Sequence, residues 1–306
     1  MYDAVLLIAF GGPENMADVR PFLANVTKGR PVPPQRLEEV VHHYALFGGR
    51  SPLNEITFRQ AAALQALLER EGRPLPVYVG MRNWRPYLHE TLEQMASTGI
   101  RRALGFILSA QQSEAGWERY QQNVVEAQER VGPRAPLIDY APGWHNHPLF
   151  IEAAADLTKI AFAQIPVERR DHVPLVFSAH SVPTALPSTP TYVQQIEEGA
   201  RLVADRLGQA QWSVAYQSRS GDPRTLWLEP DIGVVLRKLA AAGAPAVVVS
   251  PIGFVCDHIE VLYDLDTEAK QIASDHGLTM IRAGTVNDHP AFIRMMADVV
   301  RKAIDA

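Results

Sequence analysis

The segment HPLFI at His147–Ile151 recurs as HPAFI at His289–Ile293, an offset of 142 residues. Each copy is followed at the same distance by an Ala-Asp pair, Ala155-Asp156 in the first and Ala297-Asp298 in the second. A segment repeated at a fixed offset indicates a duplicated structural unit. The sequence therefore predicts two similar halves, residues 1–147 and 148–306, with a last helix at about 290–306 that packs back on the first half.

Around this repeat the chain alternates short apolar runs with segments of helical periodicity, which is typical of α/β proteins. The continuous apolar runs predict parallel strands covered on both faces: Ala4–Ala9, Val77–Gly80, Arg102–Leu108, Pro174–Phe177, Trp212–Tyr216 and Ala246–Val249. A period near 3.6 predicts helices at Phe58–Glu71, Trp117–Val131, Thr191–Leu207, Asp231–Ala242 and Asp298–Ile304. Pro21–Arg36, which holds four prolines, predicts a loop.

The composition limits the class of protein. The 306 residues carry 29 Lys and Arg against 34 Asp and Glu, a net charge of −5, and 47% are hydrophobic. A disordered or collagen-like chain is excluded, and each half is long enough to bury a core. Nucleic acid is not expected as the partner, because neutralising phosphates needs clustered Lys and Arg. The single cysteine, Cys256, excludes an internal disulfide and a four-cysteine metal site, and predicts the reducing cytoplasm.

Two segments are considered as signals for a membrane, and neither fits. Met1–Phe10 carries Asp3 and no basic residue before its apolar run, so it does not resemble a signal peptide. The longest uncharged stretch, Leu239–Cys256, is interrupted by prolines and glycines and is too short to span a bilayer. We expect a monomer without integral membrane contact.

A small-molecule site is expected beyond the carboxyl ends of the strands, where open α/β sheets bind ligands. The residues that follow the strands in the two halves are Phe10–Pro13, Ser109–Gln112, His180–Pro183 and Pro251–Glu260. His180 stands at such a strand end, before Ser181 and Pro183. It is interpreted as a metal ligand or general base; the alternative is an imidazole satisfied by backbone carbonyls.

The segment from Asp257 to Glu268 is rich in carboxylates. If it is helical, Glu260, Asp264 and Glu268 lie four residues apart and form one stripe. A solvated acidic face is one interpretation. The other is a cation site, because carboxylate oxygens beside an imidazole suit a hydrated divalent ion such as Mg²⁺, or Fe²⁺ in transit.

Anion-binding motifs are weak. The sequence contains neither G-x-G-x-x-G nor G-x-x-x-x-G-K-[ST], which disfavours a dinucleotide or P-loop enzyme. Lys28, Arg30 and Arg36 form a basic segment without an acidic residue. This segment is interpreted either as a contact for an anionic ligand or as solvated surface.

Taken together, these segments resemble the ferrochelatases. The motifs that carry the resemblance span nearly the whole chain: Phe10–Glu14, Tyr44–Leu53, Phe177–Pro183, Tyr216–Gly221 with Trp227-Leu228, and Pro251–Asp264. The likeness is closest to the coproporphyrin ferrochelatases of actinobacteria, notably in Pro21–Arg30 and Arg82-Asn83-Trp84.

The resemblance implies two Rossmann-like halves, each a parallel sheet flanked by helices, with a porphyrin cleft between them. It implies a cytoplasmic lyase of haem biosynthesis that inserts Fe²⁺ into coproporphyrin III, releases two protons and hands coproheme to a decarboxylase. His180 and Glu260 are implied as metal-binding and catalytic residues, with a neutral imidazole suited to accept protons near pH 7. Asp264 and Glu268 are implied as an outer metal relay, with Mg²⁺ as an ion that this acidic site could hold.

The resemblance also implies contacts for the porphyrin: Phe10, Pro13, Arg30, Tyr44, Ser51, Tyr120 and Trp227. Phe10 stands where some relatives carry a tyrosine that reaches the metal, and phenylalanine cannot ligate. His43 replaces an arginine of some relatives beside the propionate-binding tyrosine. No organic cofactor is implied, and one cysteine cannot hold the [2Fe–2S] cluster of some relatives.

Three other functions stay open at this point. They are insertion of iron into protoporphyrin IX, insertion of Co²⁺ or Ni²⁺ into a related tetrapyrrole, and haem binding without catalysis by a two-lobed protein.

Overall fold

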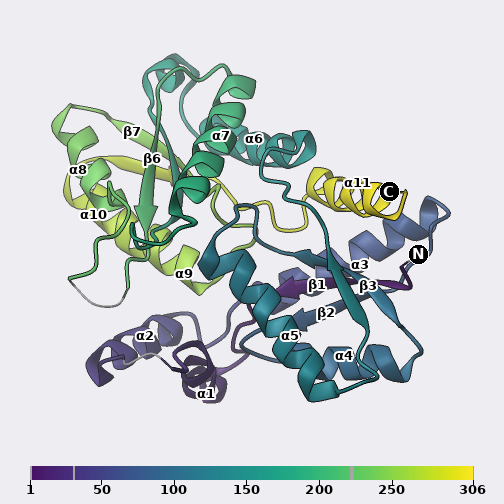
Figure 1. Ribbon diagram of the computed structural model, residues 1–306. Coiled ribbons are helices and arrows are strands. Elements are labelled where there is room, and N and C mark those ends of the chain that lie inside the picture. The colour runs from purple at the N-terminus through teal and green to yellow at the C-terminus, as the bar shows by residue number, and fades with distance from the viewer. Residues whose placement is uncertain (1, 30–31, 221–223, 306) are drawn as a thin grey trace. The chain divides into compact units, whose positions relative to one another are not determined.

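Two four-stranded parallel sheets form the framework of the computed structural model, which describes residues 2–29, 32–220 and 224–305 apart from the side chains of Ala115 and Asp171 (Figure 1). The first sheet has the order β2-β1-β3-β4 and the second the order β6-β5-β7-β8. The strands are β1 Ala4–Ala9, β2 Val77–Met81, β3 Arg102–Ile107, β4 Leu137–Tyr140, β5 Leu175–His180, β6 Trp212–Gln217, β7 Ala246–Ser250 and β8 Thr279–Arg282.

Helices join the strands, as parallel pairing requires. The α-helices are α1 Met16–Val26, α2 Pro34–Leu46, α3 Leu53–Arg70, α4 Leu88–Ser97, α5 Arg119–Val131, α6 Pro148–Ala163, α7 Thr189–Leu207, α8 Ile232–Ala241, α9 Ile259–Val261, α10 Lys270–Asp275 and α11 Pro290–Asp305. A 3₁₀ helix covers Val167–His172, and π-helices cover Glu114–Glu118 and Leu262–Ala269. The predicted α/β class and its parallel sheets are confirmed.

The chain divides into two compact units. One contains Met1–Leu108, Ala115–Gly143 and Ile293–Ala306, and the other contains Ser109–Glu114 and Trp144–Phe292. Helix α6 follows the last strand of the first sheet but belongs to the second unit, and most of α11 follows the second sheet but belongs to the first. Salt bridges Arg301–Glu71 (2.8 Å) and Arg73–Asp305 (2.5 Å) tie α11 to the end of α3 and the residues after it.

The internal repeat extends over the whole sheet topology. β4 and β8 begin 142 residues apart, as do α6 and α11, and the two sheets have the same strand order. The repeated histidines make equivalent hydrogen bonds. His147 and His289 each accept one through Nδ1 from the backbone N–H of the residue two positions later, at 3.2 Å. The repeat was therefore a reliable guide to the duplicated fold.

All six predicted strands are present, within three residues of their expected ends. β1 is buried along its whole length. Its residues Ala4, Leu6 and Ile8 pack against α4 and α5, and Val5 and Leu7 are equally buried on the other face. This two-sided burial explains why an uninterrupted apolar run forms a central strand.

The loop predicted at Pro21–Arg36 is wrong at both ends. Pro21 lies inside α1, whose first turn is capped by Asn15: its side chain accepts hydrogen bonds from the N–H groups of Ala17 and Asp18. Burial of Val19, Phe22 and Leu23 with this cap offsets the cost of about 3 kcal/mol of an interior proline. Arg36 lies in α2, where Pro34 occupies the first turn, a position that suits proline.

The turn after β1 is clamped to α3. Asn54, which is 3% exposed, accepts from the N–H of Gly12 and donates to the Gly12 carbonyl, both at 2.9 Å. A Cβ on Gly12 would lie 2.7 Å from the Ser51 Cβ, so only glycine allows this approach. The clamp holds Phe10–Pro13 beside the start of α3.

We expect Asn54→Ala to lower the free energy of unfolding by about 2 kcal/mol or more, because it leaves the N–H and C=O of Gly12 unpaired. Denaturant unfolding measures this loss. Glu55→Ala, on the same helix as Asn54, is the control: it breaks exposed ion pairs with Arg50 and Arg59 and should cost about 1 kcal/mol or less. Equal losses in the two variants would contradict the role given to Asn54.

Candidate functional site

His180 is the last residue of β5, the strand between β6 and β7 in the second sheet. The preceding residues Leu175–Ala179 are buried, whereas the His180 side chain keeps 36% of its surface exposed. Its Nδ1 lies 2.5 Å from the carbonyl oxygen of Ser181, and the Tyr192 hydroxyl donates to the His180 carbonyl at 2.9 Å. The imidazole is thus fixed at the strand end with Nε2 available.

Glu260 lies opposite this nitrogen: its Oε1 is 2.9 Å from His180 Nε2. Glu260 belongs to α9, which follows the turn after β7, and β7 is the direct neighbour of β5. In that turn Gly253 comes so close to β5 that an added Cβ would lie 2.6 Å from the Ala179 Cβ. The two residues singled out from the sequence are therefore brought together by adjacent strands.

The segment after Glu260 is helical, as considered from the sequence, but its middle is a π-helix, Leu262–Ala269. The wider turn places Asp264 beside β6. Ser218 Oγ, directly after β6, donates to Asp264 Oδ2, and Gln217 Nε2 lies 3.5 Å from the same oxygen. π-Helical turns occur frequently at functional sites.

Ser218 joins the two carboxylates. Besides its bond to Asp264, it hydrogen-bonds Glu260 and helps to keep that carboxylate ionised. Its backbone has φ +63°, a left-handed conformation that is costly for a residue other than glycine. The strained position carries the hydroxyl to the site.

Burial disfavours charge in this site, yet His180 and Glu260 stabilise each other. Burial alone would lower the pKa of His180, but Glu260, the Ser181 carbonyl and Asp264 outweigh it and raise the pKa to about 9. Burial acts to raise the pKa of Glu260, but the charge of His180 and the hydrogen bonds from His180 and Ser218 hold this pKa well below its usual range. At pH 7 the pair is an imidazolium and a carboxylate, which differs from the neutral imidazole expected from the sequence.

The pKa of Asp264 is shifted in the opposite direction from that of Glu260. Burial and the neighbouring charge of Glu260 raise the pKa of this carboxyl well above its ordinary value, and Glu268 adds to the effect. Glu268 itself is exposed. Of the three carboxylates singled out from the sequence, Glu260 and Asp264 thus have pKa values shifted in opposite directions, and Glu268 lies at the surface.

Most predicted porphyrin contacts lie in the first unit. Phe10 and Tyr44 pack around Phe22, with ring centroids 6.2 and 5.9 Å away, and Trp84 adds a third ring at 6.2 Å. The Ser51 N–H donates to the Pro13 carbonyl at 2.9 Å. These side chains form an aromatic cluster beside the turn that Asn54 clamps.

Tyr120, a further predicted contact, is connected to Phe10 through Arg82, whose guanidinium carbon lies 5.7 and 5.8 Å from the two ring centroids. In the second unit Trp227 pairs with Pro183 in a short antiparallel bridge, so it lies beside the loop that follows His180. Arg30 lies outside the described residues.

Sequence reasoning missed Ser218, Gln217, Tyr192 and Arg82 as members of these clusters. The first two stand in a quoted family motif, Tyr216–Gly221, and follow a predicted strand, so their position could have been noticed. Nothing in the sequence connects Tyr192, in α7, to the His180 carbonyl.

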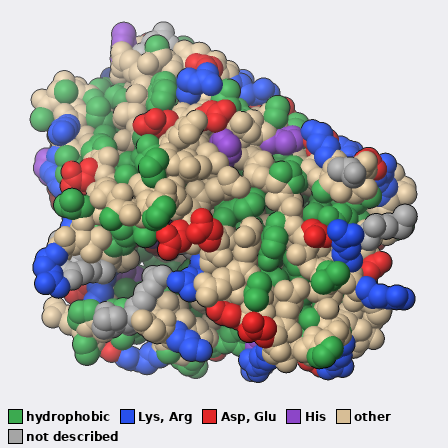
Figure 2. Space-filling view, viewed as in Figure 1, with side chains coloured by type: hydrophobic (Ala, Val, Ile, Leu, Met, Phe, Trp, Pro, Cys, Tyr) green, Lys and Arg blue, Asp and Glu red, His purple; other side chains and the backbone are tan. Residues whose placement is uncertain are grey.

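Three further observations concern partners. No helix within the described ranges is long and apolar enough to cross a membrane. Acidic and basic side chains are interspersed over the face drawn in Figure 2, without a broad basic patch there. Among the residues whose positions are given, no three His, Cys, Asp or Glu side chains are arranged to hold a metal ion together.

The fold is that of a chelatase. SirB from Bacillus subtilis, solved with Fe³⁺, superposes with a TM-score of 0.61 over 99% of this chain and 95% of SirB, at 12% identity. DR2241 from Deinococcus radiodurans, a multi-domain protein similar to chelatases, gives a TM-score of 0.58 over 97% of this chain and 55% of its own, at 13% identity.

The sequence profile of the ferrochelatase family matches residues 2–304. The chain is 45% identical to the coproporphyrin III ferrochelatase of Mycolicibacterium smegmatis over 98% of its length and 89% of the relative. It is 45% identical to that of Streptomyces coelicolor (98% and 84% covered), and 42% identical to a ferrochelatase of Rhodopirellula baltica (99% and 86%). The chain belongs to the ferrochelatase family, as the motifs indicated.

The raised pKa of His180 predicts a pH-dependent contribution to stability. Because the folded value, about 9, exceeds the ordinary 6.5, the imidazolium stabilises the folded chain fully below pH 6.5, and this is lost as the pH rises through 9. We expect the stability difference between wild type and His180→Gln to narrow over that interval in denaturant unfolding. The exposed His276→Gln variant is the control; a constant difference for His180→Gln would contradict the raised pKa.

Proposed function

We propose that this chain is a coproporphyrin III ferrochelatase, a lyase that inserts Fe²⁺ into coproporphyrin III to give coproheme with release of two protons. The observation that carries the proposal is the His180–Glu260 pair, 2.9 Å apart at the carboxyl edge of the second sheet, in a ferrochelatase-family chain. The Mycolicibacterium and Streptomyces relatives support the choice of porphyrin.

The reaction exchanges two pyrrole N–H protons for one Fe²⁺, so the site must accept protons while it admits a dication. His180 and Glu260 supply a base and a negative charge at one place. The resting imidazole already holds a proton, since its pKa is about 9. An approaching dication lowers that pKa by repulsion, which releases the proton and leaves a neutral imidazole able to bind metal or accept a pyrrole proton.

Asp264 and Glu268 are proposed as the outer relay for protons and metal. Their oxygen donors suit a hydrated hard cation held through water, such as Mg²⁺. The Ser218 hydroxyl, which is hydrogen-bonded to Asp264 and to Glu260, connects this relay to Glu260. Calorimetric titration with Mg²⁺ tests whether this site binds the ion. Mg²⁺ binding that persists in the double variant Asp264→Asn/Glu268→Gln would contradict the assignment of Mg²⁺ to this site.

The porphyrin contacts remain those implied by the family: Phe10, Pro13, Arg30, Tyr44, Ser51, Tyr120 and Trp227. The packing of Phe10 and Tyr44 around Phe22 offers flat apolar surface, which suits a macrocycle. Lys28, which follows α1, and Arg36, in α2, supply positive charge for carboxylates, and coproporphyrin carries four where protoporphyrin carries two.

We expect His180→Ala to reduce kcat for anaerobic iron insertion by about 100-fold or more, because it removes the base and metal ligand. The absorbance change of the porphyrin measures the rate. His276→Ala changes an exposed histidine at the end of α10 that is not one of the site residues, and it should retain wild-type activity. Near-normal insertion by His180→Ala would disprove the assigned role.

Substrate choice is tested by comparing coproporphyrin III with protoporphyrin IX, each with Fe²⁺, and then Fe²⁺ with Co²⁺ and Ni²⁺. We expect faster turnover of coproporphyrin and of iron. Equal turnover of both porphyrins would contradict the assignment to coproporphyrin. A preference for Co²⁺ or Ni²⁺ over Fe²⁺ would indicate a related chelatase. Tight haem binding without metal insertion would indicate a binding protein.

The proposal extends to a monomer working in the cytoplasm, with a coproheme decarboxylase as the enzyme that takes the product. Cys256 is the single cysteine and is free, so the chain has no internal disulfide, which is in keeping with a reducing compartment. Sedimentation of the pure protein tests the monomer, and co-purification tests the handover.

A further inference from the structure

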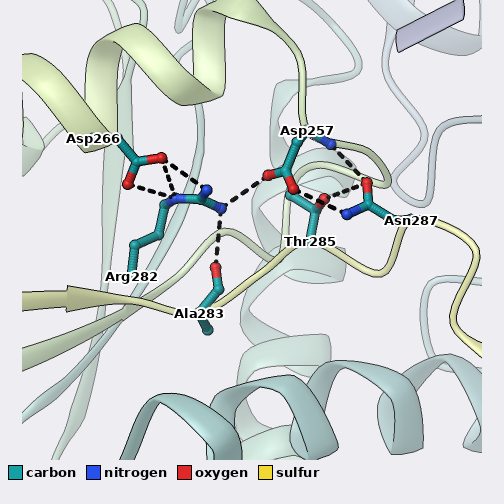
Figure 3. A network of polar contacts seen from close by, with 6 residues as sticks. All are labelled: Asp257, Asp266, Arg282, Ala283, Thr285 and Asn287. Carbon is teal, nitrogen blue, oxygen red and sulfur yellow. Dashed lines mark hydrogen bonds and ion pairs between the residues drawn. The ribbon is translucent and has the colours of Figure 1, made fainter. Parts of the chain in front are cut away.

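Arg282, the last residue of β8, lies at the centre of a buried ion-pair network (Figure 3). Its Nε is 2.9 and 3.0 Å from the two oxygens of Asp266, and Nη2 is 2.8 Å from one of them. Its Nη1 is 2.9 Å from Asp257 Oδ1 and 3.2 Å from the Ala283 carbonyl. All three nitrogens of the guanidinium are therefore engaged within the protein.

The two carboxylates stand on either side of the acidic site residues in the chain. Asp257 comes three residues before Glu260, and Asp266 two residues after Asp264, inside the π-helix. The guanidinium therefore joins the start of this segment to its middle and holds both against β8. The side chains of Arg282, Asp257 and Asp266 are only 13, 20 and 28% exposed, so solvent screens the ion pairs weakly.

Asn287 secures the same end of the segment. Its Oδ1 accepts from the Asp257 N–H at 2.9 Å and from the Thr285 hydroxyl at 3.0 Å, while its Nδ2 donates to Asp257 Oδ2 at 2.9 Å. Asp257 thus has fixed partners on its backbone and on both oxygens (Figure 3). The network leaves the segment Asp257–Asp266 little freedom at either end.

We propose that Arg282 is a positioning residue for iron insertion: by clamping Asp257 and Asp266 it fixes the segment that holds Glu260 opposite His180 and Asp264 beside Ser218. This role rests on the proposed function. Arginine suits it because one planar group bonds two carboxylates at once, whereas lysine offers a single point charge. Arg282 contacts neither metal nor porphyrin in this role.

The test uses the full chain with Arg282→Lys, and Arg282→Met as a second variant. We expect kcat for iron insertion to fall by about tenfold or more in Arg282→Lys, the loss typical when a group that orients a metal ligand is removed. The KM for porphyrin should stay unchanged. Hydrogen exchange of the metal-free protein should become faster in residues 259–269 and not elsewhere.

Arg206→Met is the matched control, because Arg206 makes an ion pair with Glu152 at 3.1 Å in the same unit, between helices α7 and α6 that hold none of the proposed site residues. It should retain kcat. Wild-type kcat in Arg282→Lys, or unchanged exchange in residues 259–269, would overturn the clamp. If wild type itself inserts no iron, the proposed function fails, while the exchange measurement still decides whether Arg282 holds the segment.

Discussion

The contact between His180 and Glu260 exists because β5 and β7 are neighbours in a parallel sheet. Parallel strands end at the same edge, so the residue that closes one strand meets the segment that follows the next. The 2.9 Å separation further requires Gly253, since a side chain there would push the turn away from Ala179. Backbone topology brings the two groups to one edge, and local packing sets their distance.

Charge is distributed unevenly over the acidic residues of this site. Glu260 faces an imidazolium and stays ionised, whereas Asp264, half-buried near Glu260, has a raised pKa and holds its proton more tightly. Two carboxyls four residues apart therefore have opposite tendencies, set by their neighbours and not by their type. In the proposed function, this difference would let protons move away from an incoming metal ion while negative charge remains next to it.

Much of this arrangement could be predicted from the sequence. Uninterrupted apolar runs such as Ala4–Ala9 became central strands, and the 142-residue repeat anticipated the duplicated topology. The strands β4 and β8 were missed because each has only four residues and lies at a sheet edge, where polar side chains are tolerated. Helix α1 was missed because Pro21 indicates a loop in the sequence pattern, although Asn15 provides an N-cap for a helix.

In the site, the positions of His180 and Glu260 near the ends of strands identified them from the sequence. The partners that set their charge were harder to predict. Ser218 reaches Asp264 only because β6 lies next to β5 and because Ser218 adopts a left-handed backbone. The π-helix is likewise invisible to periodicity, since the same residues fit an α-helix. Interactions between segments, and departures from regular geometry, depend on the assembled fold.

The membership of α11 in the first unit has a consequence for the order of events during synthesis. Strands β1 to β4 leave the ribosome long before Arg301 and Asp305, which pair with Glu71 and Arg73. The first unit thus stays incomplete until α11 has been made, although amino-terminal domains usually fold first. A chain that stopped before α11 would lack part of the unit whose strands are made first.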